Sequence, residues 1–172
     1  MKRIFLLSIV ITMFLPATAQ KAKKGDFNPS ANYEVQVLGV GQDGTKVFRI
    51  WNTASKVDDA ITEAKRNAVA VCLFRGLPGS GFTNETPPIC QIGDEIKYEE
   101  FFKEFFKLPQ KDGTGGMYLR FVNRTTDEPP SGQFRVKVKK GYKVAIDVQV
   151  LYNSLRKYME EQGIVKKLDS GF

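Results

Sequence analysis

The chain has 172 residues, a formal net charge of +7 and no histidine. This length suits one ordinary domain with a sizeable core. The lack of histidine excludes the serine–histidine and cysteine–histidine nucleophile systems and most zinc chemistry.

The first 19 residues have the layout of a secretory signal peptide. Lys2 and Arg3 precede an apolar run over 4–15, and Ala17-Thr18-Ala19 is a small-x-small cleavage site. We therefore expect cleavage near Ala19, a periplasmic or secreted protein, and no transmembrane segment in the mature chain. An uncleaved membrane anchor is the alternative, although the apolar run is shorter than the roughly 20 residues that span a bilayer.

Residues 20–32 are rich in lysine and poor in apolar side chains, which predicts a disordered leader. Residues 33–38 and 46–51 both alternate, with a turn at Asp43-Gly44 between them, and so predict a β-hairpin. The glycines within 39–44 match GxGxxG, but a strand follows them where a dinucleotide site requires a helix. The hairpin is therefore the favoured interpretation.

The strongest helix is predicted over 55–74. Ser55 is expected to open it and Gly76 to close it. Alanines at every fourth position share one face, which predicts close packing on a sheet. These alanines are Ala60, Ala64 and Ala68.

Two cysteines, Cys72 in this helix and Cys90 in the loop after it, are expected to form a disulfide. An exported chain meets an oxidising environment, and closing this loop would stabilise the fold by roughly 3 kcal/mol. The alternative for Cys72 is a free thiol that packs as a small core residue. Two cysteines without histidine make a poor zinc site, so no metal is expected.

Residues 76–116 are predicted to form an insertion of two loops around a short helix at 98–107. Four phenylalanines give this helix a broad apolar stripe, which suits burial against the sheet. An aromatic binding surface is the alternative, because exposed aromatic side chains often anchor interfaces. The four are Phe101, Phe102, Phe105 and Phe106.

Three strands, at 117–123, 134–138 and 143–150, and a helix at 151–162 are predicted for the remainder. In the second strand, apolar residues alternate with basic ones, so Arg135, Lys137 and Lys139 should point outward from a half-buried strand. Such a basic face suits an anionic envelope polymer, and a solvated surface is the alternative.

The order of these elements predicts an α+β fold in one domain over 33–168. We expect a largely antiparallel sheet with two main helices packed on one face and the short aromatic-rich helix in the insertion. Val37-Leu38-Gly39-Val40-Gly41, the alanine-rich helix and the strand at 143–150 resemble the envelope domain at the N-terminus of flagellar assembly protein T and related small outer-membrane lipoproteins. The resemblance covers 33–75 and 134–165.

The resemblance implies a non-enzymatic periplasmic scaffold or assembly factor. Two departures are the absence of a lipidation cysteine after the cleavage site and the insertion at 76–116. We expect a non-catalytic cell-envelope protein that binds an envelope protein or an anionic envelope polymer, with no nucleic acid partner and no cofactor. A secreted protein that binds a small ligand between the sheet and the aromatic helix is the alternative. A histidine-free hydrolase with paired carboxylates is the third hypothesis.

Overall fold

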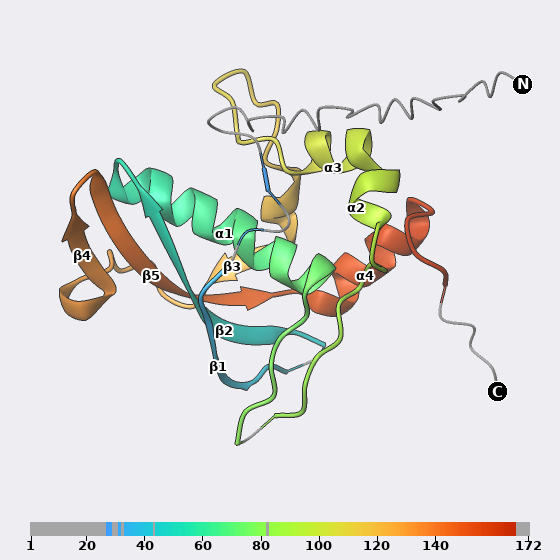
Figure 1. The fold of residues 1–172 in the computed structure, drawn as a ribbon, viewed down its shortest axis with the longest axis horizontal. Helices are drawn as coiled ribbons and strands as arrows, with labels where there is room; N and C mark the ends of the chain where they lie inside the picture. The colour runs from blue at the N-terminus through green and yellow to red at the C-terminus, as the bar shows by residue number, and fades with distance from the viewer. Residues whose placement is uncertain (1–26, 29–30, 32, 43, 82, 168–172) are drawn as a thin grey trace, which may run out of the picture.

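The structure is a computed structural model that describes residues 27–28, 31, 33–42, 44–81 and 83–167 (Figure 1). The predicted signal peptide, its cleavage site and most of the predicted leader lie outside these residues. Phe27, Asn28 and Ala31 are the described members of the leader.

The described chain is an α+β fold, as predicted, and its elements follow the predicted order. The strands are β1 (Val35–Val40), β2 (Lys46–Ala54), β3 (Val122–Arg124), β4 (Arg135–Val138) and β5 (Gly141–Val150). The α-helices are α1 (Val57–Phe74), α2 (Asp94–Lys97), α3 (Glu99–Phe105) and α4 (Tyr152–Glu161). Two 3₁₀-helices are η1 (Met117–Phe121) and η2 (Gly132–Phe134).

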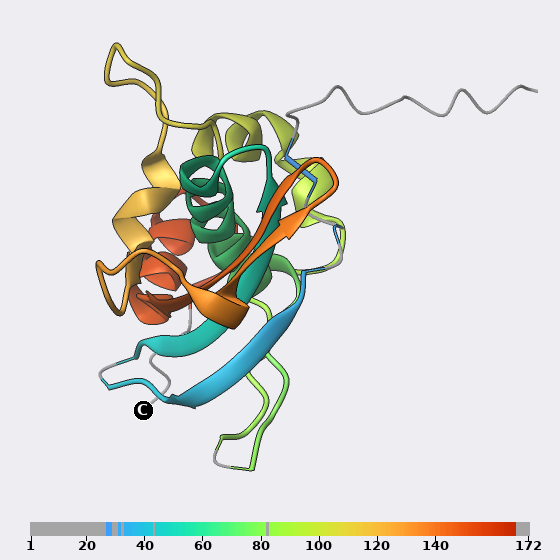
Figure 2. The same ribbon diagram turned by 90° about the vertical axis from the view of Figure 1, so that its left-hand side faces the viewer.

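The sheet is antiparallel and is organised around β5. One edge of β5 pairs with β2 along nearly its whole length, from Lys46 opposite Val150 to Ala54 opposite Tyr142. The other edge pairs with β4 near its beginning and with β3 near its end. β1 extends the sheet beyond β2, so the predicted hairpin is confirmed. Figure 2 shows how these strands curl.

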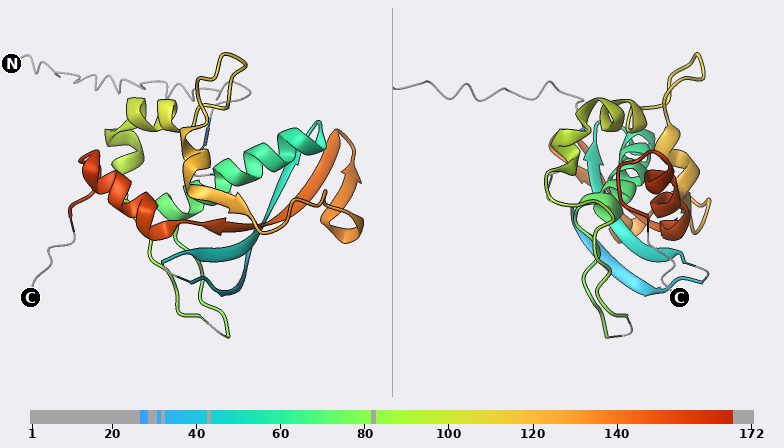
Figure 3. Two further views of the ribbon diagram at one scale, coloured as in Figure 1. Left: turned by 180° about the vertical axis from the view of Figure 1, so that it is seen from behind. Right: turned by 90° about the vertical axis from the view of Figure 1, so that its right-hand side faces the viewer.

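Helix α1 lies across the sheet and packs against β2 and β5 (Figures 1 and 3). Ala60, Ala64 and Ala68 are fully buried, as the four-residue spacing predicts. The start differs from the prediction, because Lys56 rather than Ser55 is the N-cap and no side chain caps the helix. Helix α4 continues from β5 and packs against η1; its placement on the same face as α1 stays a prediction.

The strand predicted over 117–123 is wrong for its first five residues, which form η1. Tyr118 and Phe121 are both buried. A 3₁₀-helix has three residues per turn, so this spacing places them on the same side. The pattern of apolar residues therefore fits η1 as well as it fits a strand.

The strand predicted at 134–138 is present, but its predicted half-burial is wrong. β4 covers Arg135–Val138, and its first three residues are exposed, including Val136 with an exposed fraction of 48%. Its main contacts are with β5 and η2 at the edge of the sheet. An edge strand away from the main helix has no buried face for its valines, so alternation did not produce burial.

Arg49 and Asp147 face each other across β2 and β5 in a two-point ion pair, with N–O distances of 2.6 and 2.9 Å. The Arg49 guanidinium also lies 4.0 Å from the centroid of the Phe134 ring. We expect Asp147→Ala to lower the free energy of unfolding by about 1–2 kcal/mol, because a partly buried bidentate pair is lost. Urea unfolding of the single and double variants with Arg49→Ala would measure the coupling.

The matched control is Glu34→Ala, which removes the single-contact pair with Lys143. That pair is more exposed, so we expect a loss of less than about 0.5 kcal/mol. If Asp147→Ala and Glu34→Ala lowered the free energy of unfolding equally, the Arg49–Asp147 pair would not be more stabilising than the exposed pair.

Candidate functional site

An open groove of about 900 Å³ lies along α3. We call it the α3 groove. It is lined by α2, α3, the segment 106–110, Arg66 of α1 and Phe27. Its apolar lining consists of Phe27, Ile96, Phe102, Phe106 and Leu108. Its charged lining consists of Arg66, Glu95, Glu99, Glu100, Lys103, Glu104 and Lys107.

The phenylalanines of the predicted binding stripe divide between two sides of α3. Phe102 and Phe106 line the α3 groove and are nearly fully buried. Phe101 and Phe105 instead lie near Tyr158 of α4, with ring centroids 6.4 and 6.0 Å from it. Phe105 is 1% exposed and Phe101 is half-buried. The stripe is therefore mainly core, and part of that core forms the groove.

Phe27 joins this cluster from the segment predicted as a disordered leader. Its ring is stacked on Phe106, with centroids 3.9 Å apart, and it lines the groove. At this residue the prediction of a free leader is wrong. The sequence signal was weak, because Phe27 is an isolated aromatic among polar residues and its partner lies far along the chain.

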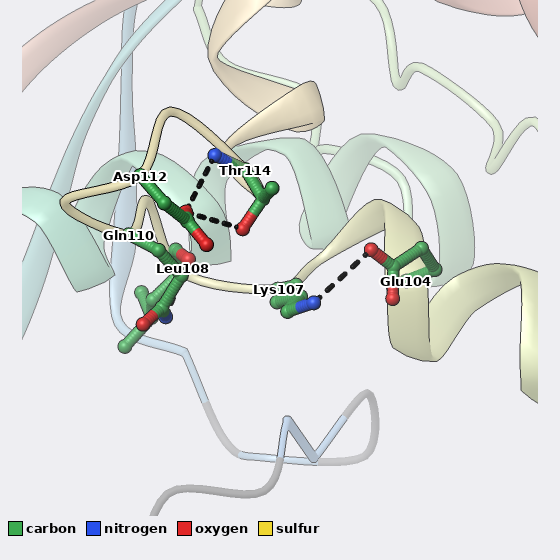
Figure 4. Close-up of polar contacts among 6 residues, drawn as sticks. All are labelled: Glu104, Lys107, Leu108, Gln110, Asp112 and Thr114. Atoms are coloured by element: carbon green, nitrogen blue, oxygen red, sulfur yellow. Dashed lines mark hydrogen bonds and ion pairs between the residues drawn. The ribbon is translucent and has the colours of Figure 1, made fainter.

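The loop between α3 and η1 forms one end of the groove and is held by its own hydrogen bonds (Figure 4). The Asp112 carboxylate accepts bonds from the Thr114 amide and hydroxyl, at 2.9 and 2.7 Å, and these bonds lower the pKa of Asp112. The Gly116 amide donates to the Lys107 carbonyl at 2.7 Å, which closes the loop. Lys107 also pairs with Glu104 at 3.4 Å. This end of the groove is therefore preorganised.

Arg66 is the candidate residue that the sequence analysis missed. It lines the groove from α1, yet its exposed fraction is only 9%. Its guanidinium carbon lies 5.8 Å from the Phe27 ring centroid, and within the described chain its Nε has no hydrogen-bond partner. Burial raises the pKa of Tyr118 to about 12, and Arg66 opposes that rise. Its immediate neighbours, Lys65 and Asn67, are also polar, so no signal in the sequence indicated that Arg66 is buried.

The predicted basic residues lie elsewhere. Arg135 and Lys137 are exposed on β4, and Lys139 is exposed in the turn after it. Arg135 lies 5.2 Å from the Tyr142 ring centroid. Figure 1 places β4 at the end of the molecule away from α2. The two predicted groups of binding residues therefore do not form one site.

The predicted disulfide is not formed, because Cys72 and Cys90 are free and buried in the structure. Backbone hydrogen bonds hold the two segments together instead. The Ile89 amide donates to the Cys72 carbonyl at 3.1 Å, and the Cys90 amide donates to the Leu73 carbonyl at 2.8 Å. Burial raises the pKa of each thiol to about 12. Both thiols therefore belong to the core.

In the described part of the chain, no three or more acidic, cysteine or histidine side chains are placed to hold a metal ion. None of the helices described there is long and apolar enough to cross a membrane.

Comparison with protein-family models, curated proteins and solved structures finds no significant match.

Proposed function

We propose that the chain is a non-catalytic, exported protein of the cell envelope that binds a partner protein beside the α3 groove. The layout of residues 1–19 supports export, and the absence of histidine supports a role other than catalysis. The resemblance to the envelope domain of flagellar assembly protein T agrees with a scaffold or assembly role. The periplasm or the outside of the cell is the proposed location.

The exposed apolar surface at Ile92 and Ile96 carries this proposal. Their exposed fractions are 105% and 75%, and Ile96 also lines the groove. Exposing isoleucine side chains to water is unfavourable, and burying them against a partner would contribute favourable binding free energy. Neighbouring exposed apolar side chains with a charged surround are typical of protein interaction sites. We name Ile92 and Ile96 the isoleucine patch.

An envelope polymer is the second candidate partner, and the exposed basic residues of β4 favour it. Arg135 and Lys137 are exposed on an edge strand, on either side of the exposed Val136. Binding there would depend mainly on charge and would weaken as salt screens it. A protein bound at the isoleucine patch would resist salt.

The test is cross-linked capture of partners from the native envelope, compared across three proteins. We expect wild type to capture one dominant partner in high salt, and Ile92→Ser/Ile96→Ser to lose at least about nine-tenths of it. Val136→Ser is the matched control, because Val136 is an exposed β-branched residue far from the patch and should retain capture.

Thermal unfolding of each variant would check that it remains folded. Diffuse capture that high salt removes would contradict binding at the isoleucine patch. It would instead support the polymer, particularly if Lys137→Glu reduced it.

A further inference from the structure

Arg66 is unusual because it is 9% exposed and, within the described residues, its Nε has no hydrogen-bond partner and no ion pair joins it to a carboxylate. Tyr118, whose ring lies 6.1 Å from that of Phe106, is also buried, and its hydroxyl has no hydrogen-bond partner in the same part of the chain. Buried charges in proteins are normally paired, because removing them from water is costly. An arginine with an unpartnered Nε in the wall of an open groove therefore suits an anionic ligand.

The surroundings of Arg66 define the rest of the ligand. Phe27, Phe102 and Phe106 supply aromatic surface beside it. The groove volume of about 900 Å³ falls in the range of sites that bury a small molecule. Such sites combine an apolar lining with a few polar groups that fix the orientation of the ligand.

We infer that the α3 groove binds a free monocarboxylate with an apolar body, whose carboxylate pairs with Arg66. A guanidinium presents parallel N–H donors that match the two oxygens of a carboxylate. The apolar body lies against the aromatic lining. Neither the sequence analysis nor the proposed partner binding assigns this ligand.

The glutamates of the groove limit the ligand to one negative charge. Glu100 and Glu104 have lysine partners, Lys103 at 3.8 Å and Lys107 at 3.4 Å. Glu95 accepts a hydrogen bond from the Gly93 amide at 3.1 Å, and Glu99 lies on the exposed side of α3. These carboxylates would repel a ligand with several negative charges. A ligand with one carboxylate, placed at Arg66, would bring only its apolar body near them.

The two proposals share Ile96, which belongs to the isoleucine patch and also lines the groove. They are tested separately, because ligand binding is measured on the purified protein alone, whereas partner capture requires the envelope. Failure of ligand binding in calorimetry would therefore not decide the capture experiment, nor the reverse.

The experiment is titration calorimetry with laurate and with 1-dodecanol, each below its aggregation concentration. The two probes share a twelve-carbon body, and only laurate carries a charge. We expect laurate to bind wild type and to raise the melting temperature. Arg66→Gln should weaken laurate roughly ten- to a hundred-fold, as expected for the loss of charged hydrogen bonds, and should leave dodecanol unchanged.

Lys137→Gln is the control, since Lys137 is an exposed cation on β4 and does not line the groove. It should change laurate affinity by less than about two-fold, because exposed charges contribute little. Arg66→Lys keeps the charge without the two-pronged geometry and should give an intermediate affinity.

Three results would overturn the inference: no laurate binding, equal affinity for laurate and dodecanol, or unchanged affinity in Arg66→Gln. If Arg66→Gln does not fold, the affinities of wild type and of Arg66→Lys for laurate and for dodecanol still test the inference.

Discussion

Phe105→Ala is expected to lower the free energy of unfolding by about 3–5 kcal/mol, the usual loss for a large aromatic deleted from a core. Phe105 is 1% exposed and its ring neighbours come from three elements. Phe106 lies 4.9 Å away at the end of α3, Phe121 lies 6.1 Å away in η1, and Tyr158 lies 6.0 Å away in α4. Alanine would leave a cavity that these rings cannot all close. Urea unfolding monitored by circular dichroism measures the loss.

Phe101→Ala is the matched control, because it makes the same change one turn earlier on the same side of α3. Phe101 is half-buried, so we expect a loss of only about 1.5–2.5 kcal/mol, half of the value expected for the fully buried Phe105. Similar losses in the two variants would show that Phe105 is not a core residue in solution. A folded Phe105→Ala protein of unchanged stability would restore the aromatic stripe as a surface for binding.

The parts of the fold that the sequence predicted well are those in which local pattern and tertiary packing agree. The alternation over 33–38 and 46–51 becomes the β1–β2 hairpin, and the alanine spacing becomes the buried face of α1. At the end of α4, Gly163 has the positive φ of 70° expected of its position, and the Ile164 amide donates to the Met159 carbonyl at 2.9 Å.

The errors arise where pattern does not specify the neighbours. Met117, Leu119 and Phe121 have the spacing of two that fits a strand, whereas Tyr118 and Phe121 have the spacing of three that fits a 3₁₀-helix. The alternation around Val136 is that of a half-buried strand, but burial depends on a layer above β4 that the pattern cannot reveal. Likewise, an even cysteine count says nothing about the distance between Cys72 and Cys90.

The candidate site was predicted only in part, for a similar reason. The four phenylalanines in a short segment indicated α3 as a candidate site. Which side of α3 faces the groove and which faces α4 depends on the positions of α1 and α4, which the sequence does not specify. Arg66 follows helical spacing that would suit a solvent-facing residue, and only the fold shows that it is buried. Phe27 becomes part of the site through its contact with Phe106.

The two buried thiols should make the protein unusually sensitive to alkaline pH. Burial raises the pKa of Cys72 and of Cys90 from 9.0 to about 12, and the negative charges of Asp94 and Glu95 add to the rise at Cys90. Above pH 9 the thiols ionise in the unfolded chain but stay protonated in the folded protein. The unfolded state then binds fewer protons, so stability is fully present below pH 9 and is lost as the pH rises towards 12.

Each thiol should remove about 1.4 kcal/mol per pH unit across this window. Burial also raises the pKa of Tyr33 and Tyr118 from 10.0 to about 12, so both add to the loss above pH 10. A domain of this size is stable by about 5–15 kcal/mol, and we expect most of that stability to be lost by about pH 11. Urea unfolding at pH 7, 9, 10 and 11, with a reductant present, would measure it.

Cys72→Ala/Cys90→Ala separates the thiols from the tyrosines. The double variant should be less stable at pH 7, because two small cavities replace the sulfur atoms. Between pH 9 and 10, however, its stability should be nearly constant while that of wild type falls by about 2–3 kcal/mol. If the free energy of unfolding fell equally with pH in both proteins, the thiols would not be the cause of the alkaline sensitivity. In a parallel series without reductant, a wild-type curve that is flat over the same pH range and steep only with reductant would show instead that Cys72 and Cys90 form the disulfide predicted from the sequence.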